Sequence, residues 1–267
     1  MANRSRDLLT PSEIKPLLTT KWLGGTIHHF PTVDSTNSKA YRLALHGAAE
    51  GDVVVAESQT KGRGRLGRTW YSPPFLNLYL SVILRPKIPP RQASLITLMA
   101  AVATAETIET FSGLPPLIKW PNDILLGGRK VAGLLHELHS EMDRVDFVIL
   151  GIGVNLNMDG KTFSQEIREV ATSLKKEMGK TVSRQAFLQS LLQKLEVWYE
   201  IFLKEGAPPV LKAWRDRAQI KGRPVRVTSD GETLTGLAVD ITSDGALMIK
   251  TEDGRQKRIM AGDVEYA

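Results

Sequence analysis

Cysteine is absent from this chain of 267 residues. The absence excludes disulfides, thiolate chemistry and zinc sites built on cysteine. No apolar run approaches the roughly 20 residues that a helix needs to cross a bilayer. The first residues, Met1 to Asp7, also lack the apolar core of a secretory signal. The sequence therefore predicts a cytoplasmic protein without a membrane partner.

The remaining composition is that of a folded globular protein, because 42% of the residues are hydrophobic and 24% are charged. Lysine and arginine number 35 against 29 aspartates and glutamates, which gives a net charge of +6. Such an excess favours an anionic substrate or an acidic partner. It does not by itself establish nucleic-acid binding, which needs the charge gathered on one face.

The most unusual stretch runs from Gln59 to Trp70 and is called the glycine loop below. Within it, cations alternate with glycines and no acid intervenes: Lys61, Gly62, Arg63, Gly64, Arg65, Gly67 and Arg68. Glycine lets backbone N–H groups approach a ligand closely, and arginine matches carboxylate and phosphate oxygens. We therefore expect a loop that closes over a phosphorylated or carboxylated ligand. From these residues alone, a solvated basic loop and a loop that contacts nucleic acid are equally good interpretations.

Periodicity and turn residues predict mixed strands and helices before residue 221. Strands are expected at 26–33, 52–58, 77–85, 117–119, 124–126, 130–138 and 145–154, and helices at 38–46, 90–111, 164–179, 183–206 and 210–218. Thr10 and Glu13 predict a short first helix with a capping box. The Gly127-Gly128 pair predicts a tight hairpin turn. Hairpins mixed with helices favour an α+β fold over a doubly wound parallel sheet.

The run from Asp34 to Asn37 directly follows the first expected strand. Each of these four residue types caps helices well, so the run is explained by the start of the next helix. A strand end and a helix N-terminus also present hydroxyl and N–H donors to a small polar ligand. Both interpretations are open from these residues alone.

The composition shifts near residue 221. Strands are expected at 224–228, 232–239, 246–250 and 256–260, separated by three Asp-Gly pairs that favour hairpin turns. The sequence therefore predicts three parts: an N-terminal arm at 1–25, a body at 26–220 and a small all-β barrel at 221–267.

Several familiar motifs are excluded. Residues 62–67 match G-x-G-x-x-G, but no helix follows and no acid lies about 20 residues on, so a dinucleotide site is rejected. No phosphate-binding P-loop, Ser-His-Asp triad or metalloprotease signature is present. His136 and His139 lack a third ligand nearby and are interpreted as ordinary side chains rather than a metal site.

Four ordered motifs remain: the glycine loop, Lys-Trp-Pro-Asn-Asp at 119–123, Lys-Val-Ala-Gly-Leu-Leu-His-Glu at 130–137 and Gly-Ile-Gly-Val-Asn-Leu-Asn at 151–157. Together they resemble the catalytic domain of biotin protein ligases, over roughly residues 26 to 267. The resemblance implies a mixed central sheet with helices and an SH3-like C-terminal β-barrel. Lipoate ligases share this fold, but their arginine-glycine signature differs.

The resemblance implies an ATP-dependent ligase. Biotin's carboxylate attacks the α-phosphate of ATP, with Mg²⁺, to give biotinyl-5′-AMP, and a lysine of a biotin carboxyl carrier protein then takes the biotinyl group. Alternatives are lipoate attachment on the same fold or a nucleic-acid-binding module that uses the glycine loop. The arm at 1–25 is too short for a helix-turn-helix domain, so a monofunctional ligase without a complete DNA-binding domain is expected. The family also implies a homodimer.

The same resemblance assigns roles to residues that match the motifs. The biotin-binding residues are Ser35, Thr36, Asn37, Gln59, Arg63, Gly64, Arg65, Lys130 and Gly133. The residues assigned to ATP and the adenylate are Arg65, Arg68, Trp70, Lys119 and Asn155. The catalytic residues are Arg63, Arg65, Lys130 and Asp123, and no protein metal ligand is expected.

Overall fold

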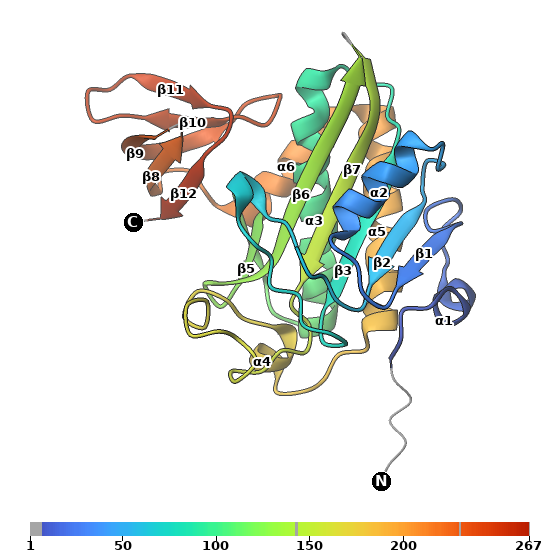
Figure 1. Ribbon diagram of the computed structural model, residues 1–267. Coiled ribbons are helices and arrows are strands. Elements are labelled where there is room, and N and C mark those ends of the chain that lie inside the picture. The colour runs from blue at the N-terminus through green and yellow to red at the C-terminus, as the bar shows by residue number, and fades with distance from the viewer. Residues whose placement is uncertain (1–6, 142–143, 230, 267) are drawn as a thin grey trace.

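A seven-stranded mixed sheet forms the centre of the body (Figure 1). The computed structural model describes residues 7–141, 144–229 and 231–266. The strand order is β1-β2-β3-β7-β6-β5-β4, in which β1 and β2 are parallel and the other neighbours antiparallel. The strands are β1 (Ile27–Phe30), β2 (Val53–Ala56), β3 (Leu78–Leu84), β4 (Leu117–Lys119), β5 (Asp123–Leu126), β6 (Arg129–Glu141) and β7 (Arg144–Val154). The expected α+β class with a mixed central sheet is confirmed.

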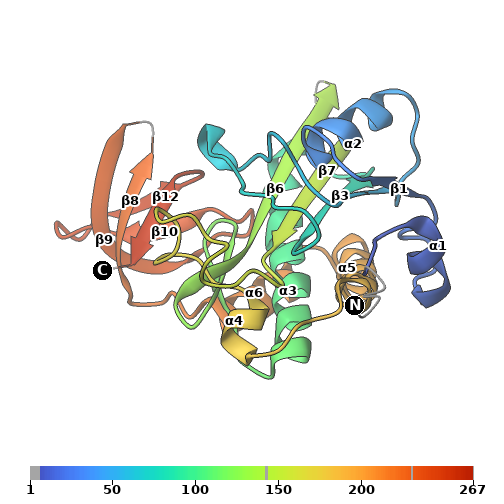
Figure 2. The ribbon, with the colours of Figure 1, turned by 60° about the horizontal axis from the view of Figure 1, so that its bottom comes forward.

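Helices cover both faces of this sheet. One face carries α2 (Thr36–Leu45), and the other carries α3 (Ala93–Ser112), α5 (Arg184–Glu205) and α6 (Ala207–Ala218) (Figures 1 and 2). The short helices α1 (Pro11–Ile14) and α4 (Leu174–Met178) lie at the periphery. The predicted end of α3 is confirmed, because Gly113 adopts the left-handed conformation with φ 69° that ends many helices.

Among the described residues, one helical segment, Pro90–Ser112, is long and apolar enough to cross a membrane by length and composition. It contains α3, and 72% of its most apolar window is buried inside the fold. The helix packs between the sheet and α5 and α6, which explains an apolar surface on all sides. Its hydrophobicity is therefore that of a core helix.

The hairpin of β5 and β6 positions the residues of two motifs. Gly127 and Gly128 both have positive φ, at 57° and 78°, as the predicted tight turn requires. The turn brings Asp123 of β5 opposite Gly133 of β6. The chain enters β5 through a cis peptide bond between Trp120 and Pro121.

The N-terminal segment is tied to the body by a buried ion pair. Glu57 and Arg184 lie 2.7 Å apart with side chains 1% and 2% exposed. Glu57 also accepts the backbone N–H of Leu9 at 2.9 Å, and Asp7 accepts N–H groups at the start of α5. This network links the arm and α5 to the residue that follows β2.

The C-terminal part is a five-stranded antiparallel sheet in the order β11-β10-β9-β8-β12. Its strands are β8 (Pro224–Ser229), β9 (Glu232–Ile241), β10 (Leu247–Lys250), β11 (Gln256–Ile259) and β12 (Asp263–Tyr266). It packs against the body through specific bonds, such as the Trp120 indole N–H to the Gly245 carbonyl at 3.0 Å and Ser94 Oγ to the Asp244 carbonyl at 2.8 Å. The last strand, β12, was missed by the sequence patterns.

Three local expectations were wrong. Thr10 makes no side-chain cap of α1, and its hydroxyl instead pairs with Ser12 at 3.0 Å, so the capping box is not formed. The helix expected at 164–179 is reduced to α4, because the preceding segment bonds to β6: Lys130 N–H donates to the Val170 carbonyl at 2.8 Å. The helix expected from residue 210 begins three residues earlier, at Ala207.

Candidate active site

A cavity of about 720 Å³ opens between the N-terminus of α2, the glycine loop, strands β6 and β7 and the segment 158–171. The structure brings every residue to which the resemblance assigned a role to this cavity. They are Ser35, Thr36, Asn37, Gln59, Arg63, Gly64, Arg65, Arg68, Trp70, Lys119, Asp123, Lys130, Gly133 and Asn155. Four motifs far apart in the sequence therefore form one site.

One end of the cavity is a polar subsite at the N-terminus of α2, which we call the ring subsite: Ser35, Thr36, Asn37 and Gln59. Ser35 occupies the cap position but makes no side-chain cap bond. The N–H of Thr36 donates instead to Gln59 Oε1 at 2.8 Å. Gln59 thus satisfies a donor of this helix terminus, and the Ser35 side chain lines the cavity without capping the helix.

Buried Ser81 of β3 fixes the orientation of the ring subsite. Its hydroxyl lies 2.8 Å from Thr36 Oγ1 and 2.6 Å from Asn37 Oδ1. The Asn37 carboxamide lies directly over Gly151 of β7, where an added Cβ would come within 2.0 Å of Asn37 Oδ1. Only glycine at position 151 leaves room for this arrangement.

The glycine loop is a tight, self-bonded turn. Trp70 N–H donates to the Gly62 carbonyl at 2.9 Å, and Gly64 N–H donates to the Arg68 carbonyl at 2.7 Å. A Cβ at Gly62 would lie 2.3 Å from the Trp70 carbonyl oxygen. At the tip, Leu66 and Gly67 have positive φ, at 55° and 73°. The glycines are thus required by backbone contacts inside the loop as well as by access for a ligand.

The loop places the Trp70 indole on a floor made by glycines of β6 and β7. A Cβ at Gly153 would lie 2.5 Å from the ring, and a Cβ at Gly133 would lie 3.0 Å from it. Lys130 Nζ is 5.4 Å from the ring centroid. Among the described residues, the buried indole N–H has no hydrogen-bond partner.

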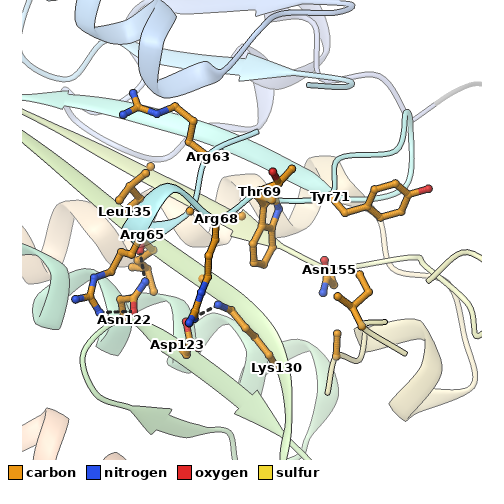
Figure 3. A pocket seen from close by; sticks show the side chains of 18 of the residues that line it. Arg63, Arg65, Arg68, Thr69, Tyr71, Asn122, Asp123, Lys130, Leu135 and Asn155 are labelled. Atoms are coloured by element: carbon orange, nitrogen blue, oxygen red, sulfur yellow. Dashed lines mark hydrogen bonds and ion pairs between the residues drawn. The ribbon is translucent and has the colours of Figure 1, made fainter. Parts of the chain in front are cut away.

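Three cations of the cavity, Arg65, Arg68 and Lys130, lie near Asp123 and Asn122 (Figure 3). Lys130 Nζ lies 2.6 Å from Asp123 Oδ1, and Arg65 Nη1 donates to Asn122 Oδ1 at 3.3 Å. Arg68 pairs with Asp263 of β12. We call Lys130, Arg65 and Arg68 the cationic centre. Burial lowers the pKa of Arg65, while Asp263 and Asp123 raise it and Arg68 lowers it further.

Arg63 is not part of this centre. Its guanidinium points away from Arg65, Arg68 and Lys130 in Figure 3 and forms an ion pair with Glu137 of β6 at 2.8 Å. The sequence assigned Arg63 to the carboxylate and the reaction centre, whereas in this structure its charge lies beside the ring subsite.

The other end of the cavity is lined by Asn155 and the segment 158–171. Asn155 is buried, and its Nδ2 donates to the Thr172 carbonyl at 3.1 Å. The lining segment includes Met158, Phe163 and Ile167, so this end combines apolar walls with a few polar groups, as small-molecule sites usually do. Lys119 lines another part of the cavity: it pairs with Asp123 across β4 and β5, and its Nζ lies 5.7 Å from the ring of Tyr266 in β12.

Comparison with known proteins identifies the family of the chain. Residues 29–155 match the biotin/lipoate A/B protein ligase family and residues 221–266 match the biotin protein ligase C terminal domain. The bifunctional ligase/repressor BirA of Bacillus subtilis is 38% identical over 257 residues, which cover 96% of this chain and 79% of that protein. The biotin–[acetyl-CoA-carboxylase] ligase of Paracoccus denitrificans is 35% identical, over 84% of this chain and 93% of that protein.

The chain belongs to the biotin protein ligase family. The biotin protein ligase of Aquifex aeolicus, solved in complex with biotin and ATP, superposes with a TM-score of 0.78 at 29% identity, over 91% of this chain and 99% of that one. The expectation of an enzyme of the ligase class, with biotin and ATP as its small molecules, is confirmed by these relatives.

The sequence motifs assigned no role to four polar residues that bond to side chains lining the cavity: Ser81, Asn122, Glu137 and Asp263. Asn122 lies inside the Lys-Trp-Pro-Asn-Asp motif. Glu137 lies on the same face of β6 as Gly133 and Leu135, because the three are spaced by two residues. Both positions could therefore have been identified from the sequence. No local pattern could identify Ser81 and Asp263, because their partners are far away in the sequence.

Metal ligands were not expected from the protein, and the described residues contain no group of three or more His, Cys, Asp or Glu side chains that could hold a metal. His136 instead pairs with Thr97 at 2.6 Å, and His139 with Tyr41 at 3.0 Å. Burial, with a smaller contribution from the positive charge of Arg65, lowers the pKa of His136. Magnesium in nucleotide sites is bound by substrate phosphates, waters and one or two carboxylates. The Mg²⁺ expectation stays a prediction.

Proposed function

We propose that this protein activates biotin with ATP and transfers it to a lysine of a biotin carboxyl carrier protein. In the first step a carboxylate oxygen bonds to the α-phosphorus, and the bond to the leaving pyrophosphate breaks. In the second step the lysine amine bonds to the acyl carbon, the acyl–oxygen bond breaks, AMP leaves and the amine loses a proton. The observation that supports this best is that all four motifs converge on one cavity in a member of this family.

The cavity suits this chemistry at each end. The ring subsite offers hydroxyl and amide groups to the ureido ring of biotin, and the segment around Asn155 offers an apolar wall to a nucleobase. The cationic centre lies between them, where carboxylate and α-phosphate must meet. Fixed positive charge in a site shielded from water stabilises the negative charge that develops there.

We assign the roles as follows. Lys130 is held by Asp123 and supplies a fixed cation to the reacting oxygens, while Arg65 and Arg68 neutralise the phosphates. Asp123, which lies 2.6 Å from Lys130 Nζ, also orients the incoming acceptor lysine. The glycine loop closes the cavity and keeps water from the adenylate.

We also propose the division into an arm at 1–25, a body at 26–220 and a C-terminal domain at 221–267. The homodimer and the monofunctional type stay predictions.

The direct test combines the protein with ATP, Mg²⁺, biotin and a carrier domain. We expect a biotinylated lysine on the carrier, detected by streptavidin blot. No label under saturating substrates, from protein shown to be folded, would sink the proposal. Lipoic acid in place of biotin tests the alternative substrate of this fold, and label from lipoic acid alone would reassign the enzyme. Salt-sensitive DNA binding in the absence of labelling would favour the nucleic-acid alternative.

A further inference from the structure

Glu137 of β6 lies between the ring subsite and the glycine loop. Its Oε1 is 2.8 Å from Arg63 Nη1, and its Oε2 accepts a hydrogen bond from Asn37 Nδ2 at 2.9 Å. One carboxylate therefore joins a cation of the loop to an amide of α2. Its side chain is only 23% exposed, so the bonds form in a partly desolvated place where they are stronger than at the surface.

The Asn37 carboxamide has little freedom to rearrange independently of Glu137. Its oxygen accepts from Ser81 at 2.6 Å, and its nitrogen donates to the Leu135 carbonyl at 3.2 Å as well as to Glu137. A ligand that bonds to Asn37 acts on the same amide that holds Glu137. Through that carboxylate, any shift is passed on to Arg63.

Arg63 is suited to anchor the loop. It is the first arginine of the glycine loop, and it leaves the cationic centre to meet Glu137 (Figure 3). Across the loop, Arg63 pairs with Thr69 as a β-bridge, so holding Arg63 also holds the strand that leads to Trp70. At the far end of the loop, Arg68 is held by Asp263. The loop is thus fixed at both ends by carboxylates, and only Glu137 is in contact with the ring subsite.

We propose that Glu137 is a positioning residue that couples occupation of the ring subsite to closure of the glycine loop, with Arg63 as the anchor. The inference rests on the proposed function, because it takes biotin as the ligand of the ring subsite. A ring bound at Asn37 steadies the carboxamide, the carboxamide steadies Glu137, and Glu137 holds the loop shut through Arg63. The empty subsite leaves the loop free to open.

The first experiment measures loop closure without chemistry. Trypsin cleavage after the loop's basic residues is followed by mass spectrometry with and without biotin, in wild type, Glu137→Gln and Arg63→Gln. We expect biotin to slow cleavage in wild type. In both variants, the factor by which biotin slows cleavage should be at least about fivefold smaller. Arg63 is 49% exposed, so Arg63→Gln tests the pair even if Glu137→Gln destabilises the fold. The control is Glu109→Gln, which removes a carboxylate 3.1 Å from Arg217, between α3 and α6 and outside the cavity.

The second experiment is a double-mutant cycle on carrier labelling. Each single variant is expected to raise KM for biotin about tenfold and to change kcat less than about threefold, because the cationic centre is untouched. If the two residues act as a unit, the double variant raises KM for biotin no more than either single variant does. A merely structural role would lower thermal stability in each variant and leave KM for biotin unchanged.

The outcomes separate this inference from the proposed function. The role of Glu137 would be overturned if wild type labels the carrier while biotin still protects both variants fully from trypsin, or if the effects on KM for biotin are additive. The proposed ligase function would be unaffected by that result. Wild type that neither binds biotin nor labels a carrier would overturn both.

Discussion

Gly151 determines how closely Asn37 can approach the sheet. An alanine Cβ there would come within 2.0 Å of Asn37 Oδ1, so the amide must move from its bonds to Ser81 and Glu137. We expect Gly151→Ala to raise KM for biotin about tenfold and to cost about 1–3 kcal/mol of stability from overpacking. Steady-state labelling and thermal unfolding measure the two effects.

A matched control exists for this substitution. Gly160 has no atom within 4 Å of an added Cβ, so Gly160→Ala should leave both quantities unchanged. In an Asn37→Ala background the clash disappears, and Gly151→Ala should then add no further loss. A further tenfold loss in that background would show that the glycine acts on something other than Asn37.

Lys130 is paired inside the cavity with Asp123 at 2.6 Å, and its Nζ lies 5.4 Å from the centroid of the Trp70 ring. We expect Lys130→Ala to reduce adenylate formation by about 10²–10³-fold, the usual cost of losing one electrostatic donor to the transition state. Pyrophosphate release with biotin and ATP, without carrier, isolates this step. Lys180→Ala, at an exposed position, should behave as wild type. Near-normal pyrophosphate release by folded Lys130→Ala would refute the assignment.

At the scale of elements, the end of β2 carries the most buried ion pair of the described residues. Desolvation raises the pKa of Glu57, but the Leu9 N–H and Arg184 together hold it below its ordinary value of 4.5. A lowered carboxyl pKa contributes stability that is complete above 4.5 and is lost as the pH falls through the folded-state pKa. The arm, α5 and β2 should therefore loosen together in acid.

Replacement of Glu57 tests this coupling. Glu57→Gln leaves Arg184 buried without its counter-charge, which costs about 3–5 kcal/mol at pH 7. We expect the difference in unfolding free energy between wild type and variant to shrink from pH 7 to pH 3, because the wild-type carboxylate becomes protonated. Denaturant unfolding at several pH values measures this difference. A difference that stays constant with pH would contradict the ionised pair.

Local chemistry made part of this architecture predictable. The Gly127-Gly128 turn and the Gly113 end of α3 follow from the positive φ that glycine tolerates, and both were predicted. The segment before α4 was not, because its backbone bonds go to Lys130, more than thirty positions earlier. The strand β12 is short and pairs with β8 rather than with a sequence neighbour.

The candidate site was likewise predictable from the sequence only in part. The resemblance carried by the four motifs identified side chains that line the cavity, whereas the residue types alone left structural explanations open. Neither gave the direction of Arg63 or the partners Glu137 and Asp263. Those depend on which distant strands lie side by side, and no local pattern encodes that.

At the scale of the whole molecule, the C-terminal sheet contributes Asp263 to the cavity of the body. Its pair with Arg68 is partly exposed, at 67% and 33%, and such pairs contribute about 0–1 kcal/mol to stability. Asp263 pairs with Arg68, which the proposed function assigns to the phosphates of ATP. Its negative charge therefore opposes the nucleotide more than it stabilises the fold.

We expect Asp263→Asn to lower KM for ATP roughly two- to fivefold, with no measurable change in thermal stability. The substitution removes a negative charge that repels the polyanionic nucleotide, and it frees Arg68 to bind the phosphates. The effect should fade in 0.5 M salt, where the screening length falls to a few ångströms. Asp240→Asn is the control: it removes the same charge from the same sheet, at a carboxylate 2.6 Å from Arg215 and outside the cavity. A raised KM for ATP in Asp263→Asn would show that Asp263 serves to dock the glycine loop on the C-terminal sheet, and that this docking outweighs the repulsion between its carboxylate and the nucleotide.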